Sequence, residues 1–428
     1  MDDAGAQDRS TIIRIQGLRA SAYGFGTVVL GSVLAAEGLS ASQVGWVFAA
    51  MLAGMALTSV GVGRAGDRVG RRRLYAGLFA VMVAAGTVFA VTTWLPALVV
   101  AALTGTLSTD PNESGPITSL EQAMLSSAPA RRRPGVFARY NAVAYIAGSA
   151  GALAAAAPGV LRRVLGGAPA DHWWLLALPV IAVGCWALAR TLSATVEPAA
   201  EASAPPGGLR RSRRTVQYLA GLFAVDAFGG GLVVQSFLVF WLQRRYGASI
   251  EVLGLIFAAS GLLQAGSSLA AGRLGARIGL LNVMVFTHIP SNALLAAVPL
   301  APNLGVAVGL LLGRFALSQM DVPARQAYIA ALVDPGERTA AAAYTNTARY
   351  ITRPGGPLVA GALMQRVGLT APFFAAGAVK VAYDLVLYAV FRRVPLPAEI
   401  SVAALTPAVA TEVGDSATAT SSVEPPRG

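Results

Sequence analysis

The chain has 428 residues, and its composition is that of a membrane protein rather than of a soluble one. Hydrophobic residues make up 55% of it and charged residues 13%, against roughly 25% charged residues in a usual soluble domain. So few charges cannot cover the surface of soluble domains, and the high hydrophobicity excludes general disorder. The net charge of +12 does not indicate a nucleic-acid-binding protein, because the arginines fall in short clusters between long apolar runs.

Two further features restrict the chemistry. Cys185 is the one cysteine, so an intrachain disulfide is impossible and a thiolate metal site is not expected. His172 and His288 are isolated in the sequence, and we predict neither a metal ion nor a cofactor. The acidic start, Met1-Asp2-Asp3, lacks the basic residues of a signal peptide, so the first apolar run is expected to remain in the protein.

Apolar segments long enough to span a bilayer, which takes about 20 residues, follow one another along the whole chain. We count twelve, at residues 17–36, 43–63, 74–94, 96–128 (interrupted), 138–160, 173–192, 216–242, 251–272, 281–300, 303–333, 341–364 and 371–391. A hydrophilic stretch at 196–214 has the composition of a flexible linker, and the tail at 395–428 that of a disordered segment. The sequence therefore predicts an all-α integral membrane protein, with six-helix bundles in 1–195 and 215–394.

The arginines predict the orientation. Most lie in one set of loops and at the termini: Arg9, Arg14, Arg19, Arg64, Arg68, Arg71–Arg73, Arg131–Arg133, Arg139, Arg190, Arg210, Arg211, Arg213, Arg214, Arg273, Arg277, Arg338, Arg392 and Arg393. The opposite loops carry only Arg162, Arg163, Arg244, Arg245 and Arg366. Because the basic side of a membrane protein faces the cytoplasm, we expect a multi-pass protein of the plasma (inner) membrane with both termini and the linker inside.

The two halves of the chain match at fixed offsets. Gly63-Arg64 aligns with Gly272-Arg273 at an offset of 209 residues, and Gln122-Ala123 with Gln326-Ala327 at an offset of 204. Such a match predicts a parallel repeat, with the pseudo-symmetry axis along the membrane normal. A substrate is then expected to bind between the halves, near the midplane.

The loop after the second span carries a recognisable signature, Gly63-Arg64-Ala65-Gly66-Asp67-Arg68-Val69-Gly70-Arg71-Arg72. It resembles the pattern between spans 2 and 3 of the major facilitator superfamily: Gly, three residues, Asp-Arg, one residue, Gly-Arg-Arg/Lys. The resemblance covers about residues 16–393. It implies secondary transport by alternating access, with spans 1, 4, 7 and 10 lining a central cavity.

The signature residues are candidates for a cytoplasmic gate: Gly63, Gly66, Asp67, Arg68, Gly70, Arg71 and Arg72. The glycines allow helix ends to approach closely, and Asp67 can accept hydrogen bonds from a helix N-terminus or an arginine. The alternative is a topology anchor with a tight turn. The second-half copy has Ala276 in place of the acid, so the two halves are not expected to gate equivalently.

Charges inside predicted spans cost at least about 2.5–3.5 kcal/mol each, which makes them functional hypotheses. Asp226 in span 7, with Asp110 and Glu113 in span 4, are the candidates for proton or cation coupling. Asp110 precedes Pro111 and is expected to cap a helix. The alternatives are that span 4 ends early and its acids lie in a loop, and that Asp226 is the structural partner of an arginine.

Spans 10 and 11 contribute candidate counter-charges or contacts for an anionic substrate, namely Arg314, Asp321, Arg325, Arg349 and Arg353. Asp321 and Arg325 are spaced i,i+4 and can form an ion pair on one helix face. Lys380 and Asp384 in span 12 have the same spacing and are expected to be a structural pair. His288 is a weaker candidate for the cavity wall.

Together these features predict a monomeric secondary transporter that exports a small organic or toxic compound against proton flow. One alternative is proton- or ion-coupled uptake of an anionic metabolite at the arginines; another is a membrane receptor or scaffold without transport. No arginine lies between Pro96 and Pro129, where many proton antiporters of the superfamily carry one. An enzyme is not expected, because no nucleotide loop or nucleophile–histidine pair is visible, and nucleic acid is not an expected partner.

Overall fold

The computed structural model of the protein is built from helices joined by short loops. It describes residues 2–108, 110, 115–126, 133–165, 171–197, 209, 212–334 and 337–394. The predicted linker lies largely, and the predicted tail entirely, outside these ranges.

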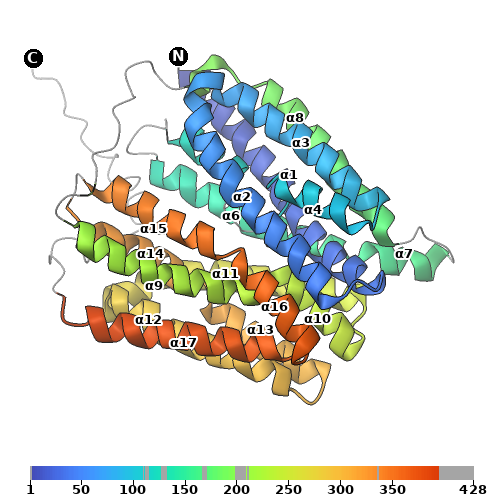
Figure 1. Cartoon of the computed structure of the whole chain (residues 1–428). Coiled ribbons are helices and arrows are strands. Elements are labelled where there is room, and N and C mark those ends of the chain that lie inside the picture. Colours follow the sequence, from blue (N-terminus) through green and yellow to red (C-terminus); the bar gives the residue numbers. More distant parts are fainter. Residues whose placement is uncertain are drawn as a thin grey trace, which may run out of the picture.

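The first half of the chain forms one helical bundle (Figure 1). Its helices are α1 (Asp2–Ala36), α2 (Ala41–Val69), α3 (Arg71–Val91), α4 (Leu95–Leu103), α5 (Pro116–Leu125), α6 (Arg133–Ala154), α7 (Ala157–Leu165) and α8 (Ala177–Arg190), with 3-10 turns η1 (Asp171–Leu176) and η2 (Ala194–Val196). Helix α1 packs along α6, and α3 packs along α8.

The second half forms the other bundle. Its helices are α9 (Arg213–Leu232), α10 (Gln235–Tyr246), α11 (Ile250–Ile278), α12 (Leu280–Ala297), α13 (Leu304–Leu317), α14 (Asp321–Leu332), α15 (Arg338–Thr352), α16 (Gly355–Arg366) and α17 (Ala371–Phe391), with the 3-10 turn η3 (Val298–Leu300). Helix α9 packs against α15, and α12 packs against α17. The first contact joins the predicted spans 7 and 11, and the second joins spans 9 and 12.

The predicted fold class, twelve spans in two bundles, is confirmed. In the described part of the chain, ten helical segments are long and apolar enough to cross a membrane. The other two predicted spans are the broken helices α4–α5 and α15–α16, each too interrupted or too polar to count by apolar length. Pro354 lies at the second break. It favours the break because proline cannot donate the backbone hydrogen bond that would continue the helix.

Helix α1 begins at Asp2, fifteen residues before the predicted apolar start at 17, so that boundary was wrong. Its early turns are buried in the bundle through Ile12 and Ile15. Asp8 is buried as well and accepts hydrogen bonds from the Ser193 hydroxyl at 2.5 Å and from the Thr195 hydroxyl at 2.6 Å. These tertiary contacts stabilise a helical segment that an apolar-length criterion excludes.

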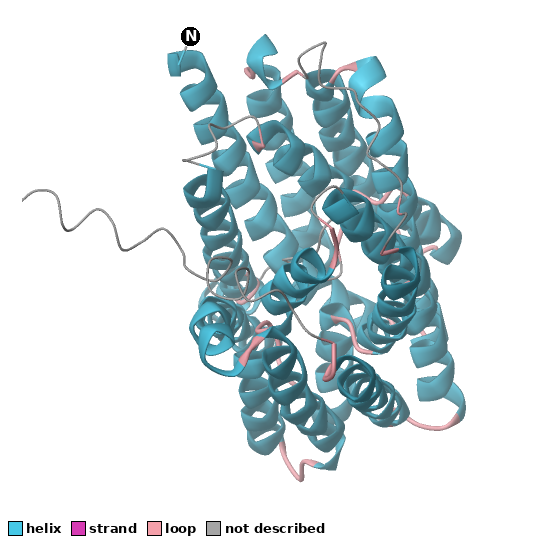
Figure 2. Cartoon of the chain, turned by 90° about the vertical axis from the view of Figure 1, so that its left-hand side faces the viewer, coloured by secondary structure: helices cyan, strands magenta, loops and turns pink. Residues whose placement is uncertain are grey.

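Both ends of the described chain lie at the same end of the helices, at the left of Figure 1. We call this the terminal side and the opposite end the distal side. The bundles diverge toward the terminal side and meet at the distal side. Figure 2, viewed from the terminal side, shows the helices arranged around the middle of the molecule.

Glycine makes the distal contact between the bundles close. A Cβ atom added to Gly45 in α2 would lie 2.5 Å from the Pro357 carbonyl oxygen in α16, and one added to Gly31 in α1 would lie 2.7 Å from the Ser236 carbonyl oxygen in α10. Apolar packing reinforces the contact, with the Phe48 and Phe237 rings edge to face at 5.1 Å. In the described structure, the distal side is therefore the closed side.

Polar contacts also cross between the bundles at the distal side. The Arg163 guanidinium forms an ion pair with Glu251 at 2.8 Å, and Arg244 donates a hydrogen bond to the Leu39 carbonyl oxygen at 3.2 Å. Arg163 is 70% exposed, so this ion pair contributes little to stability, at most about 1 kcal/mol. The glycine and aromatic contacts therefore contribute most to keeping the distal side closed.

Candidate functional site: the central cavity

A cavity of about 670 Å³ lies between the two bundles. Cavities of roughly 300–1,000 Å³ are typical of small-molecule sites. Its wall combines Gln16 and Arg19 of α1 and Gln122 of α5 with residues of α9, α12, α13, α14, α15 and α17. The bundles that enclose the cavity meet at the distal side and diverge toward the terminal side, so the cavity extends toward the terminal side (Figure 1).

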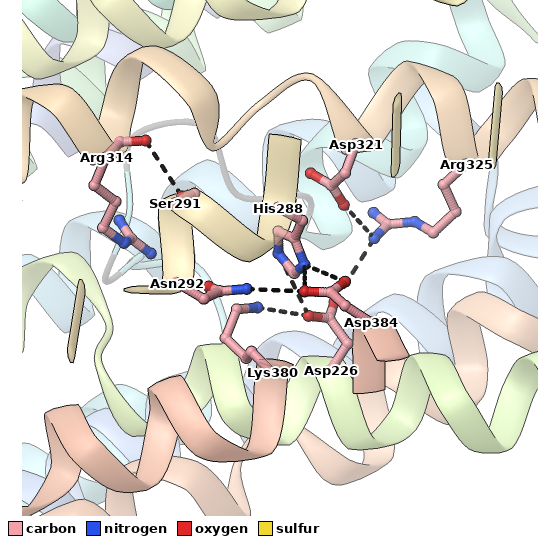
Figure 3. Close-up of polar contacts among 9 residues, drawn as sticks. All are labelled: Asp226, His288, Ser291, Asn292, Arg314, Asp321, Arg325, Lys380 and Asp384. Carbon is pink, nitrogen blue, oxygen red and sulfur yellow. Dashed lines mark hydrogen bonds and ion pairs between the residues drawn. The ribbon is translucent and has the colours of Figure 1, made fainter. Parts of the chain in front are cut away.

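The structure brings most of the predicted coupling and substrate residues to this wall, although they come from five separate segments. They are Asp110, Asp226, Arg314, Asp321, Arg325, Arg349 and Arg353. Glu113 lies outside the described residues. Figure 3 shows Asp226, Asp321 and Arg325 converging with residues of α12 and α17, whereas the Arg314 side chain lies to one side of them.

Asp226 in α9 is buried and is surrounded by cationic groups. The Lys380 ammonium of α17 lies 2.5 Å from its Oδ1 atom, the Arg325 guanidinium 3.7 Å from Oδ2, and the His288 Nε2 atom 3.8 Å from Oδ1. Gly229, one turn along α9, leaves room for the Lys380 stem, because an added Cβ there would lie 2.8 Å from Lys380 Cγ. Opposite charges at such distances favour the ionised carboxylate.

A second carboxylate, Asp384 of α17, lies behind Asp226. Its oxygens lie 2.8 and 3.0 Å from His288 Nδ1, and its Oδ2 atom accepts a hydrogen bond from the Asn292 amide at 3.3 Å (Figure 3). The prediction that Lys380 and Asp384 pair along their own helix was wrong: each pairs with a group on another helix. The long lysine side chain reaches across to α9, which the i,i+4 spacing does not reveal.

The two arginines of span 10 differ in whether a carboxylate of the described residues lies close to them. Arg325 and Asp321 form the predicted i,i+4 ion pair at 2.9 Å, which is confirmed. In the part of the chain that the structure describes, Arg314 has no carboxylate within 4 Å, and its guanidinium lies 5.1 Å from the Phe315 ring centroid. Nε of Arg314 and of Arg349 are buried without a hydrogen-bond partner among the described residues.

The first bundle holds a buried ion pair of its own that the sequence analysis missed. Arg19 of α1 contacts Glu121 of α5 at 2.7 Å, and Glu121 also accepts hydrogen bonds from the hydroxyls of Tyr75 at 2.7 Å and Tyr140 at 2.6 Å. We had assigned Arg19 to the basic cytoplasmic face; it is instead 2% exposed. Its position inside the predicted span 17–36 was the signal that marks it as a buried charge.

Span 4 is interrupted where the sequence predicts: α4 ends at Leu103, and α5 begins at Pro116 with Gly115 as its N-cap. Asp110 is not helical and lines the cavity. Residues 109 and 111–114 lie outside the described residues, so the prediction that Asp110 caps a helix stays a prediction. The Tyr23 hydroxyl donates to the Thr106 carbonyl oxygen at 2.6 Å, so part of the freed backbone is satisfied within the protein.

Comparison with known proteins agrees with this architecture. The sequence profile of the Major Facilitator Superfamily matches residues 219–418, which complements the signature at 63–72 in the other half. The second half of the chain thus resembles the major facilitator superfamily. An uncharacterized membrane protein of Saccharomyces cerevisiae is 25% identical over 413 residues, covering 88% of this chain and 92% of the yeast protein.

Solved superfamily structures share the fold over most of the chain. The nucleoside transporter NupG aligns with a TM-score of 0.72 at 13% identity, covering 90% of this chain and 99% of NupG. A bacterial homologue of the human lysosomal transporter Spinster, inward-facing and occupied, aligns with 0.71 at 16% identity, covering 91% and 97%. The Escherichia coli xylose transporter XylE, inward open, aligns with 0.66 at 14% identity, covering 91% and 97%. At these identities the likeness shows a shared fold, and the solved proteins that share it are transporters.

The superfamily signature lies at the junction of α2 and α3 on the terminal side. Gly70 there has φ +93°, a conformation that favours glycine, and it precedes the first residue of α3. The Glu197 carboxylate accepts hydrogen bonds from the backbone N–H groups of Arg71 at 2.7 Å and Arg72 at 3.1 Å. An acid just after the sixth span thus caps α3, where its charge also complements the helix dipole.

The other signature residues give a mixed picture. The side chain of Asp67 and the surroundings of Gly66 lie outside what the structure describes. A Cβ atom added to Gly63 would meet nothing within 4 Å, so the close approach predicted there is absent from this conformation. Arg68 is exposed. The gate assigned to these residues stays a prediction.

Proposed function

We propose that this transporter moves a small organic molecule across the inner membrane by alternating access, coupled to proton movement. The observation that carries the proposal is a central cavity shared by both bundles and lined by the Asp226 ion network. With the termini in the cytoplasm, as the arginine distribution predicts, the cavity faces the cytoplasm and the distal contacts close the outer side.

The charge balance of the network supports a proton as the coupling ion. Its directly bonded groups include three carboxylates (Asp226, Asp321 and Asp384) and two permanent cations (Arg325 and Lys380). His288 contacts two of the carboxylates, and a protonated imidazole brings the count to neutrality. Histidine is the side chain whose ordinary titration lies near physiological pH, so we propose that His288 carries the proton together with the acids.

Losing that proton would leave the buried network with excess negative charge. Uncompensated charge in a low-dielectric interior is costly, so the ion pairs are expected to rearrange when the proton leaves. Because Asp226, Asp384 and Arg325 lie on three different helices, such a rearrangement shifts α9, α14 and α17 relative to one another. This would link proton release to movement of the second bundle.

For the direction, we propose export of the compound against inward proton flow, as the sequence analysis predicts. The second candidate, uptake of an anionic metabolite by proton symport, is favoured by the cavity arginines Arg314 and Arg349. A pH gradient imposed in either direction across vesicles separates these two directions.

The test begins with cells that express or lack the chain, grown with a panel of toxic compounds. Compounds whose accumulation changes are then followed in proteoliposomes with an imposed pH gradient. Wild-type transport should follow the gradient, and His288→Gln should lose this response while still exchanging substrate across the membrane at equal pH. His172→Gln is the matched control, because His172 lies outside the cavity wall, 3.5 Å from Glu37. Gradient-independent wild-type transport would remove proton coupling, and absence of any transport would favour the receptor or scaffold.

A further inference from the structure

We infer that the substrate is a small polar organic anion, and that Arg314 and Arg349 on the cavity wall each bind negative charge on it. The inference deepens the proposed function and rests on the central cavity being the substrate site. Three features of the cavity wall carry it: an excess of cations, two arginines without an ion-pair partner among the described residues, and a neutral hydrogen-bonding surface on the first bundle.

The cavity wall is cationic. Its permanently charged basic residues are Arg19, Arg314, Arg325, Arg349, Arg353 and Lys380. Its acids among the described residues are Asp110, Asp226 and Asp321. A cationic compound in this space would meet an excess of like charge, whereas an anion would be stabilised.

Three of these cations are already neutralised by acids. Arg19 pairs with Glu121, Lys380 with Asp226, and Arg325 with Asp321, at distances between 2.5 and 2.9 Å. These pairs leave little capacity for another anion, because each carboxylate already lies against the cation that would bind it. They stabilise the protein rather than select its substrate.

Arg314 and Arg349 differ from those three. Neither has a carboxylate within 4 Å in the described part of the chain, whereas Arg19, Arg325 and Lys380 each have one. Both also have a buried Nε atom without a hydrogen-bond partner among the described residues, a feature that they share with Arg19. Asp110 attracts Arg314 from a greater distance, and Arg349 lies near both the cations Arg325 and Arg353 and the acids Asp226 and Asp321. Guanidinium groups bind carboxylates and phosphates in a bidentate way, so each of these arginines can bind an oxyanion group in the cavity.

The first bundle offers the rest of the molecule a polar, uncharged surface. It contributes Gln16, Thr118, Gln122, Tyr140, Asn141 and Tyr145 to the wall. Hydroxyl, amide and phenol groups of this kind match a substrate rich in hydroxyl or carbonyl groups rather than a hydrophobic substrate. At about 670 Å³ the cavity fits a metabolite-sized molecule rather than a peptide.

The test measures equilibrium binding, so it does not depend on coupling or direction. The full chain is purified in detergent, and its thermal unfolding is followed with matched probe sets. Glucose 6-phosphate and gluconate are compared with neutral glucose and cationic glucosamine, and further carboxylates, phosphate monoesters and sulfonates with their amide, alcohol and amine analogues. Anions should raise the melting temperature, and their neutral and cationic analogues should not.

The variants locate the site. Arg314→Gln and Arg349→Gln should each weaken anion binding at least tenfold, while Arg314→Lys should retain part of it. Arg277→Gln, an exposed arginine of α11, is the matched control and should bind normally. No carboxylate of the described residues lies within 4 Å of Arg314, so Arg314→Gln breaks none of the described ion pairs. Its ligand-free melting temperature should therefore not fall, which distinguishes lost binding from misfolding.

The inference is overturned if no anion in the panel stabilises the wild type, if neutral or cationic analogues do so equally, or if the double variant Arg314→Gln, Arg349→Gln still binds. Anion binding without gradient-driven transport would contradict the proposed function and leave this inference standing. Gradient-driven transport of a neutral or cationic compound would contradict this inference and leave the proposed function standing.

Discussion

Each bundle buries an ion pair between its first and fourth spans, and the two pairs have opposite polarity. In the first bundle the cation Arg19 lies on span 1 and the acid Glu121 on span 4. In the second the acid Asp226 lies on span 7 and the cation Arg325 on span 10, 3.7 Å apart. Arg325 aligns with Glu121 in the internal repeat, so the symmetry keeps the contact while the charges exchange places.

Removing one partner of the Arg19–Glu121 pair should strongly destabilise the protein. Arg19→Gln leaves the Glu121 carboxylate, which is 0% exposed, without its cation, at a cost of about 3–5 kcal/mol. Thermal or denaturant unfolding of the purified protein measures the loss. Arg14→Gln, an exposed arginine on the same helix, is the control and should change little.

The double variant Arg19→Gln, Glu121→Gln completes the cycle. It removes both charges and should recover much of the stability lost by Arg19→Gln alone, since contacting residues are not additive. Equal stability of Arg19→Gln and wild type would contradict a structural role for this ion pair.

Among the elements, α2 and α16 decide which side of the transporter is closed. Their crossing depends on Gly45 and Gly361: a Cβ atom added to either would lie 2.5 Å from a backbone oxygen of the other helix, at Pro357 or Ala41. These contacts join the two bundles, so they exist only while the distal side is closed. They are therefore contacts of one conformation and not of the fold as a whole.

Gly45→Ala should shift the protein toward the state open on the distal side. Overpacking a close contact costs about 1–3 kcal/mol, which changes the ratio of two states roughly 5- to 150-fold. Labelling of Gln122→Cys in the cavity, in a Cys185→Ser background, measures access from the terminal side and should slow. Gly61→Ala on the same helix is the control, because nothing lies within 4 Å of its added Cβ.

A decrease in thermal stability with unchanged labelling would contradict this expectation. It would mean that the α2–α16 contact belongs to the fold in every conformation.

At the scale of the whole molecule, the closed distal side and the basic terminal side define the orientation of the transporter in its membrane. A single apolar core runs from the first bundle into the distal part of the second, through residues such as Phe48 and Phe237. A separate core around Phe223 and Tyr328 occupies the terminal part of the second bundle. The second bundle can therefore separate from the first on the terminal side without exposing its own interior.

We expect the terminal side to face the cytoplasm. A cysteine replacing the exposed Arg73, in the Cys185→Ser background, should resist a membrane-impermeant maleimide in intact cells and react in inside-out vesicles. A cysteine replacing the exposed Glu37, in the loop between α1 and α2, should show the opposite pattern. The reverse result for both would invert the orientation and make the cavity face outward.

The sequence was sufficient for most of the spans and for the charges of spans 4, 7 and 10 that line the cavity. Span 12 was predicted at 371–391, and α17 covers the same residues, because bilayer thickness and a helical rise of 1.5 Å per residue fix the length of an apolar segment locally. The charges of spans 4, 7 and 10 were expected in the cavity for the same reason, since lipid does not tolerate them. Asp226, Asp110 and Arg314 do line it.

The partners of those charges depended on how the helices pack. Lys380 was assigned to Asp384 on its own helix, but the absence of a side chain at Gly229 lets it reach Asp226 on α9. Arg19 was assigned to the surface, but α5 and α6 bring Glu121 and Tyr140 against it. Apolar length and charge can be recognised segment by segment. The ion pairs Lys380–Asp226 and Arg19–Glu121 join residues more than a hundred positions apart, so they exist only once the helices have packed.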